Sequence, residues 1–196
     1  MVLLALVWGH SFVRRLGDYE STSSNNFHNF NFDGNVIQIS CSGLGGGTVL
    51  PGPKSLQLPS DIYTSFPADI VFIQAGGNDL SKPRCDPDVL AQAIFNLACS
   101  VSNVPSVRIV IVGQLLPRFN DDGVYNAKLT TVNTSLASML NDKANMVWWK
   151  HRGFWQNPQE LYSKDNVHLN RKGMTKYARS VRSAIGSQLK RFEDKS

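Results

Sequence analysis

The chain has few cysteines and no long apolar run. Its three cysteines, Cys41, Cys85 and Cys99, leave at least one unpaired, and no Cys-x-x-Cys motif or cluster of cysteine and histidine indicates a metal site. We therefore expect an intracellular, cytoplasmic protein with no metal or cofactor. The longest apolar run, residues 2–8, is far shorter than the roughly 20 residues of a membrane-spanning helix, and it lacks the flanks of a signal peptide. It predicts a core strand.

Acidic residues are scarce at the C-terminal end. The whole chain carries 20 Lys and Arg against 15 Asp and Glu, and from Lys150 onward eleven basic residues stand against four acidic ones. Such a surplus is typical of a solvated helix flank, and also of a face that contacts phosphates. The second interpretation implies an anionic membrane or RNA as a partner of the basic C-terminal helix.

Strand-like and helix-like segments alternate along the chain, which we expect to form a single domain over residues 1–196. Five apolar runs rich in branched residues predict strands buried on both faces: residues 2–8, 36–39, 69–74, 107–112 and 146–149. Three sets of apolar residues at helical spacing predict amphipathic helices between and after these strands: Leu90, Ile94, Leu97 and Val101; Leu129, Val132, Leu136 and Leu140; Met174, Tyr177, Val181 and Ile185. Asp86 and Asn170 are the predicted N-caps of the first and third helix. The pattern predicts a three-layer α/β/α sandwich around a parallel sheet.

Two stretches depart from this alternation. Residues 19–34 are rich in Asn, Ser and Phe without a clear period, which predicts a long loop and suggests a lid over the site. Residues 148–158 crowd aromatic and basic side chains, which either line a binding mouth or pack in the core: Trp148, Trp149, His151, Arg152, Phe154 and Trp155.

A serine stands where the first strand should end and a helix begin, in Gly9-His10-Ser11. A serine hydroxyl needs a base within hydrogen-bond reach and a group that orients that base. Asp165-Asn166-Val167-His168 supplies both, because residues three apart in a turn can converge on one side. We therefore predict Ser11 as nucleophile, His168 as base and Asp165 as the orienting carboxylate.

Three groups are candidate donors to the oxyanion that forms when the serine attacks a carbonyl. They are the backbone N–H of Ser11 at a helix N-terminus, the glycine loop from Gly43 to Thr48, and the side-chain amide of Asn78 in Gly76-Gly77-Asn78-Asp79. The glycine loop lacks the G-x-G-x-x-G spacing and the lysine of a phosphate-binding loop, which disfavours a cofactor site.

Each of these residues also has a purely structural interpretation. Serine is a common N-cap, so Ser11 could simply cap a helix, and the glycines could simply form a turn. Asp165 and His168 could be ordinary residues of a surface loop. Three other histidines compete as base: His10, His28 and His151. His151 is the strongest of them, although no carboxylate follows it at short range.

In this order, the motifs resemble those of the SGNH, or GDSL-type, hydrolases. The resembling blocks are Gly9-His10-Ser11, Gly46 (with Gly45 as the alternative), Gly76-Gly77-Asn78-Asp79 and Asp165-Asn166-Val167-His168. The resemblance implies a flavodoxin-like five-stranded parallel sheet, a Ser11–His168–Asp165 triad, and an oxyanion hole of Ser11, Gly46 and Asn78. His10 stands where that family usually has aspartate, and we interpret it as a structural residue.

The segment from Gly9 to Leu16 also resembles the esterase domain of LINE-type retrotransposon first-reading-frame proteins. This narrower resemblance implies part of a longer chain, an acetyl or lipid ester as substrate, and contact with RNA or membranes. We expect a serine esterase that hydrolyses acetyl or short acyl esters through an acyl-enzyme. The alternative is a catalytically retired module that binds anionic lipid or RNA.

Overall fold

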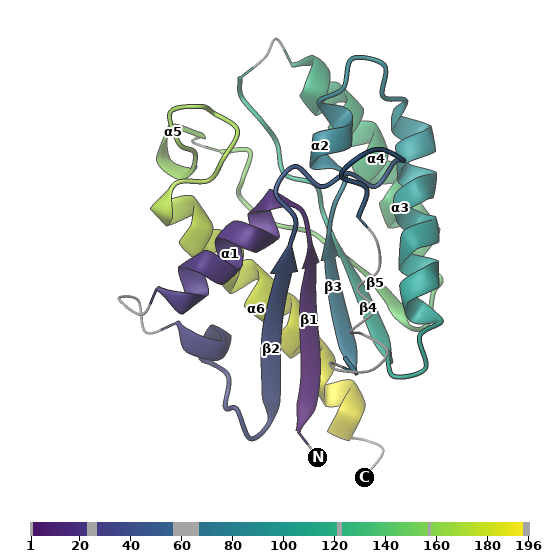
Figure 1. The fold of residues 1–196 in the computed structure, drawn as a ribbon, viewed down its shortest axis with the longest axis vertical. Coiled ribbons are helices and arrows are strands. Elements are labelled where there is room, and N and C mark those ends of the chain that lie inside the picture. The colour runs from purple at the N-terminus through teal and green to yellow at the C-terminus, as the bar shows by residue number, and fades with distance from the viewer. Residues whose placement is uncertain (1, 23–26, 57–66, 121–122, 157, 194–196) are drawn as a thin grey trace.

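Five parallel strands form one sheet in the computed structural model, which describes residues 2–22, 27–56, 67–120, 123–156 and 158–193 (Figure 1). The order across the sheet is β2-β1-β3-β4-β5. The strands are β1 (Leu3–Gly9), β2 (Ile37–Gly43), β3 (Ile70–Gln74), β4 (Ile109–Gly113) and β5 (Met146–Trp149). The predicted strands and the parallel α/β sandwich are thus confirmed.

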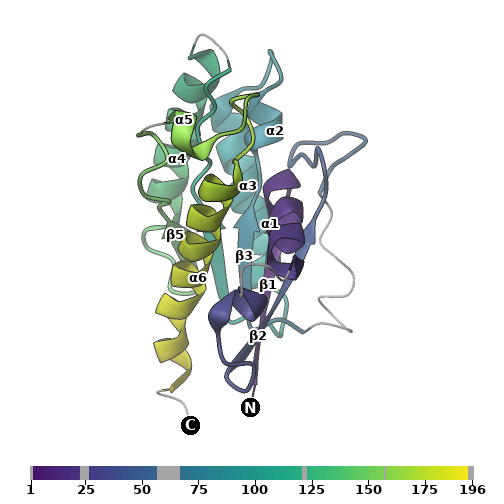
Figure 2. The same ribbon diagram turned by 90° about the vertical axis from the view of Figure 1, so that its left-hand side faces the viewer.

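Burial on both faces explains why these strands read as continuous apolar runs. Every residue of β3 and of β4 is buried, because helices cover the sheet on either side. One face packs against α3 (Pro87–Ser102) and α4 (Val124–Leu140), and the other against α1 (Ser11–Ser21) and α6 (Arg171–Glu193), as Figure 2 shows edge-on. In the described part of the chain, no helix is long and apolar enough to cross a membrane.

The predicted helix caps hold in the structure. The Asp86 carboxylate accepts hydrogen bonds from the backbone N–H groups of Asp88 and Val89, at 2.8 and 3.1 Å. The Asn170 side chain accepts one from the Gly173 N–H at 3.0 Å and so begins α6. Three short helices were not predicted: η2 (His28–Asn31), α2 (Gly77–Leu80) and α5 (Pro158–Leu161).

The interpretation of residues 19–34 as a long loop and lid is wrong for the described residues. Residues 19–21 belong to α1, and Asn29 bonds to the edge of β2 through the Ile37 carbonyl (2.8 Å) and the Ile39 N–H (2.9 Å). Ile37 and Ile39 lie at the amino end of β2, so this segment covers a sheet edge and not the carboxyl ends of the strands. The rest of the stretch, residues 23–26, lies outside the described residues.

Candidate functional site

The turn between β1 and α1 presents Ser11 at the carboxyl edge of the sheet. Gly9 lies so close to β3 that a Cβ there would be 2.0 Å from the Gln74 carbonyl oxygen, and the same oxygen accepts the His10 N–H at 3.1 Å. Only glycine fits this close approach. The chain then turns into α1, and Ser11, half-buried, is the first residue of that helix.

His10, and not Ser11, is the N-cap of α1. The His10 Nδ1 accepts a hydrogen bond from the Phe12 N–H at 3.2 Å, so its proton is on Nε2. Burial lowers the pKa of His10 to about 3, with Arg118 and His168 adding to the effect, and the ring stays neutral. Among the described residues, the Ser11 hydroxyl makes no hydrogen bond. The capping interpretation of Ser11 is therefore wrong, and the structural interpretation of His10 holds.

Asp165 and His168 form a close pair in the loop before α6. The His168 Nδ1–H donates to Asp165 Oδ2 at 2.7 Å, and Asp165 Oδ1 accepts the N–H groups of Val167 (3.0 Å) and His168 (2.9 Å). The hydrogen bond from the His168 ring is the main cause that holds the pKa of Asp165 well below its usual value. This arrangement leaves Nε2 of His168 as the ring's free acceptor.

The position of His168 is close to the start of α1. Its ring meets the Phe12 ring edge to face, with centroids 6.4 Å apart, and Phe12 directly follows Ser11. No direct hydrogen bond joins Ser11 and His168, both of which the structure describes. The missing bond does not argue against a catalytic pair, since catalytic hydrogen bonds are often long before the substrate binds.

The glycine loop forms a turn that α2 holds in place. The Gly47 N–H donates to the Leu44 carbonyl at 3.0 Å, and Gly46 has a φ of 76°, as the third residue of a type II turn requires. The Asn78 Nδ2 donates to the Gly47 carbonyl at 2.9 Å. The N–H groups of Gly45 and Gly46 have no partner in the described part of the chain, so either can serve as the loop donor.

The Asp79 side chain binds the backbone that directly follows the glycine loop. Its fully buried carboxylate accepts the N–H groups of Val49 and Leu50, at 2.9 and 3.0 Å. Burial raises the pKa of Asp79, while these two hydrogen bonds favour its charged form. Asp79 is therefore a structural residue, and it fixes the glycine loop relative to Asn78.

A family model matches most of the chain. The model of the GDSL-like lipase/acylhydrolase family matches residues 7–181, almost the whole chain. The chain belongs to this family. It is a carboxylic ester hydrolase by class, and the resemblance to SGNH, GDSL-type hydrolases is confirmed. No curated protein sequence matches the chain significantly.

Solved structures share the fold at low sequence identity. A lipase from a goat rumen metagenome has a TM-score of 0.67 and 14% identity, over 93% of this chain and 97% of that chain. An acetyl esterase mutant with an acetate ion has a TM-score of 0.66 and 18% identity, over 97% of this chain and 100% of that chain. An acetylxylan esterase of Geobacillus stearothermophilus has a TM-score of 0.62 and 13% identity, over 95% of this chain and 96% of that chain. The narrower retrotransposon resemblance stays a prediction.

His151 follows the carboxyl end of β5 and is buried in the core of this fold. Its Nδ1 lies 2.7 Å from the Ser180 hydroxyl and its Nε2 lies 3.1 Å from Gln74 Oε1, which also accepts the Tyr177 hydroxyl at 3.2 Å. Burial lowers the pKa of His151 to about 3. His28 is exposed beside Glu20, at η2. His151 and His28 therefore lack the pairing with Asp165 that His168 has.

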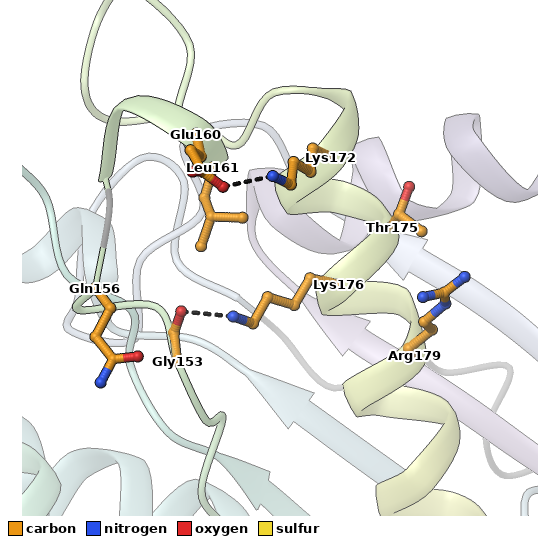
Figure 3. Close-up of a pocket in the computed structure, with 8 residues that line it drawn as sticks. All are labelled: Gly153, Gln156, Glu160, Leu161, Lys172, Thr175, Lys176 and Arg179. Atoms are coloured by element: carbon orange, nitrogen blue, oxygen red, sulfur yellow. Dashed lines mark hydrogen bonds and ion pairs between the residues drawn. The ribbon is translucent and has the colours of Figure 1, made fainter.

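The aromatic stretch 148–158 mostly packs. Phe154 and His151 are buried, and the Trp149 indole donates to the Ser180 hydroxyl at 3.0 Å. The same stretch also borders a hollow of about 410 Å³ against α6, where Lys176 reaches the Gly153 carbonyl and Lys172 pairs with Glu160 (Figure 3). Neither Ser11 nor His168 lines this hollow.

Sequence reasoning missed Arg118. Its guanidinium donates to Asn78 Oδ1 at 3.2 Å and also bonds to the Ser81 hydroxyl. No motif marks this residue, because it reaches α2 from the loop after β4. The only signal in the sequence is a basic residue shortly after a predicted strand, which is too common to single it out.

Proposed function

We propose that the chain is a serine esterase whose nucleophile is Ser11, with His168 as base and Asp165 as the group that orients the base. The observation that carries the proposal is the Asp165–His168 pair at 2.7 Å, set beside a serine whose hydroxyl is not used for capping. The substrates proposed are acetyl and short acyl esters. The fold shared with an acetyl esterase and an acetylxylan esterase supports this choice.

The first half of the reaction forms an acyl-enzyme. The Ser11 oxygen attacks the ester carbonyl while His168 Nε2 takes the hydroxyl proton, and Asp165 stabilises the imidazolium. The N–H groups of Ser11 and Gly46 and the Asn78 amide donate to the oxyanion. The tetrahedral intermediate then collapses, and the alcohol leaves with the proton from His168.

The second half releases the acid. His168 removes a proton from water, the resulting hydroxide attacks the acyl carbonyl, and Ser11 leaves with that proton. Positioned proton transfer of this kind contributes about 10² to 10⁴ in rate, and one oxyanion donor contributes about 10² to 10³.

Covalent labelling tests the proposal directly. A fluorophosphonate probe, followed by mass mapping, should label the peptide that contains Ser11, and Ser11→Ala should lose both the label and the hydrolysis of p-nitrophenyl acetate. Ser21→Ala is the matched control, because Ser21 lies on the same helix and its hydroxyl only caps the Asp18 carbonyl. Full esterase activity in Ser11→Ala would refute the proposal.

A second candidate function is RNA binding on the basic surface between α6 and the segment that follows β5. The side chains of Lys150, Arg152 and Arg179 have no ion pair in the described part of the chain, and they line a hollow of about 570 Å³ between β5 and α6. A concave surface admits a single strand more readily than a flat bilayer. Binding of a labelled single-stranded RNA should weaken as salt rises, and neutralising these three residues should reduce it. Binding to anionic vesicles alone would overturn the RNA assignment.

A further inference from the structure

Arg118 connects the proposed oxyanion donor to the rest of the site. Its Nη2 donates to Asn78 Oδ1 at 3.2 Å, and its Nη1 bonds to the Ser81 hydroxyl. The guanidinium carbon lies 4.7 Å from the centroid of the Tyr125 ring, in cation–π geometry. Arg118 therefore meets both ends of the short helix α2 that carries Asn78.

The backbone of Arg118 is fixed independently of its side chain. The Arg118 N–H donates to Asn126 Oδ1 at 3.0 Å, and Asn126 Nδ2 donates to the Arg118 carbonyl at 2.5 Å. Asn126 belongs to α4, which packs firmly against α3. Two hydrogen bonds therefore hold the Arg118 backbone against α4, besides the bonds that its side chain makes to α2.

The next residue links this support to the proposed base. The Phe119 N–H donates to the Asn166 carbonyl at 2.9 Å, and Asn166 lies between Asp165 and His168. The Phe119 ring also meets the Tyr162 ring edge to face, with centroids 5.2 Å apart. Two consecutive residues therefore contact the oxyanion donor on one side and the base loop on the other.

The guanidinium and the Gly47 carbonyl together determine which way the Asn78 amide points. An arginine has only donors, so the Asn78 atom that faces it must be the acceptor Oδ1. The Nδ2 group then faces the glycine loop, where one N–H bonds to the Gly47 carbonyl and the other remains for a substrate. Rotating the amide by 180° would place an oxygen against the oxyanion and would repel it.

We propose that Arg118 is a positioning residue for ester hydrolysis, which holds the Asn78 amide with its nitrogen toward the reacting carbonyl. The inference rests on the proposed role of Asn78 in the oxyanion hole. Arg118 touches no reacting atom. It acts together with the Gly47 carbonyl to hold one of two amide orientations, and it adds positive charge behind the donor to the oxyanion.

The main test is Arg118→Met, which keeps an unbranched side chain over Tyr125 but removes the donors. With p-nitrophenyl acetate, kcat should fall about 10- to 100-fold while KM changes less than about threefold, because Asn78 then has only the Gly47 carbonyl to hold its orientation and loses the positive charge behind it. Lys128→Gln is the matched control. Lys128 and Arg118 both line a surface hollow of about 400 Å³, and in the described part of the chain the Lys128 ammonium bonds only to the Pro83 carbonyl, so removing this cation should leave kcat unchanged.

A double-mutant cycle with Asn78→Ala separates positioning from general destabilisation. If Arg118 acts through Asn78, the double variant should be no slower than Asn78→Ala alone. Additive losses, or wild-type kcat in Arg118→Met, would overturn the proposal. Should Arg118→Met fail to fold, Arg118→Lys carries the same cycle, since it keeps the charge and the aliphatic stem with a single ammonium in place of the planar fork.

The two proposals fail in different ways. A wild-type protein that a fluorophosphonate does not label at Ser11 would refute the proposed function itself. A wild-type protein that is labelled and active, with Arg118→Met equally active, would refute only the role of Arg118.

Discussion

Replacing Asp165 with asparagine should remove most of the activity without unfolding the loop. The carboxylate Oδ2 lies 2.7 Å from His168 Nδ1, which puts the two charge centres about 4 Å apart when the imidazole is protonated. At an effective dielectric constant of about 20, this attraction is about 4 kcal/mol. Because 49% of the Asp165 side chain is exposed, solvent screening reduces it to about 2 kcal/mol, or about 30-fold in rate.

The tautomer of His168 adds to this loss. In Asp165→Asn, the amide oxygen would still accept the N–H groups of Val167 and His168, so the amide nitrogen would face the ring and donate to Nδ1. The ring proton then moves to Nε2, which can no longer accept the Ser11 proton as the proposed mechanism requires. We expect kcat to fall by about 10² to 10³ in total.

The assay is the steady-state hydrolysis of p-nitrophenyl acetate, with the melting temperature measured on the same samples. Asp165→Asn should melt within about 2 °C of the wild type, because both turn hydrogen bonds remain. Asp165→Ala is the companion variant, which loses those bonds as well and should melt lower. If Asp165→Asn hydrolyses the ester as fast as the wild type, the carboxylate does not orient the base and the reasoning is refuted.

Three smaller perturbations probe other parts of the molecule. In Gly77→Ala, a Cβ 3.2 Å from the Tyr125 hydroxyl and 3.6 Å from Arg118 Nη2 should displace the Asn78 support and lower kcat about tenfold, with little change in melting temperature. Burial lowers the pKa of His151 to about 3, so the unfolded state takes up the proton first and the free energy of unfolding falls as the pH drops from about 6.5 toward 3. In His151→Gln, unfolding free energies from urea titrations at several pH values should depend on pH less steeply, by about 1.4 kcal/mol per pH unit in this range. Asp86→Ala should cost about 1 kcal/mol and about 2 to 4 °C, because two N–H groups of α3 lose their acceptor, and an unchanged melting temperature would show that the cap is redundant.

The strands and main helices were predictable because they depend on burial, which the sequence records residue by residue. β3 and β4 are buried throughout, and the stripe from Leu129 to Leu140 lies wholly in the core. The short helix α2 was not predictable in this way. Its first turn begins after Gly76 with a φ of 104°, and four residues are too few to show a helical period.

The cap of α1 shows where residue type alone is insufficient. Serine is a preferred N-cap and histidine is not, so the sequence favoured Ser11 for that role. The backbone decides otherwise, since the close approach of Gly9 to Gln74 makes His10 the last non-helical residue, and its imidazole then takes the Phe12 N–H. The substitution of aspartate by histidine in the first motif thus preserves an acceptor at the cap while it removes a charge from the site.

Strand order explains why some of the candidate site residues lie together, but it does not explain the position of His168. Gly9 pairs with Gly43 on one side and with Gln74 on the other, so a parallel sheet necessarily brings Ser11, the glycine loop and Asn78 to one edge. His168 follows no strand of the sheet, and its position depends on packing against Phe12 and on the bond from Phe119 to Asn166. Neither contact has a sequence pattern. Because Arg118 adjoins Phe119, the residues that contact the proposed base loop and the proposed oxyanion donor lie side by side in a loop without any recognisable motif, and only the folded chain reveals them.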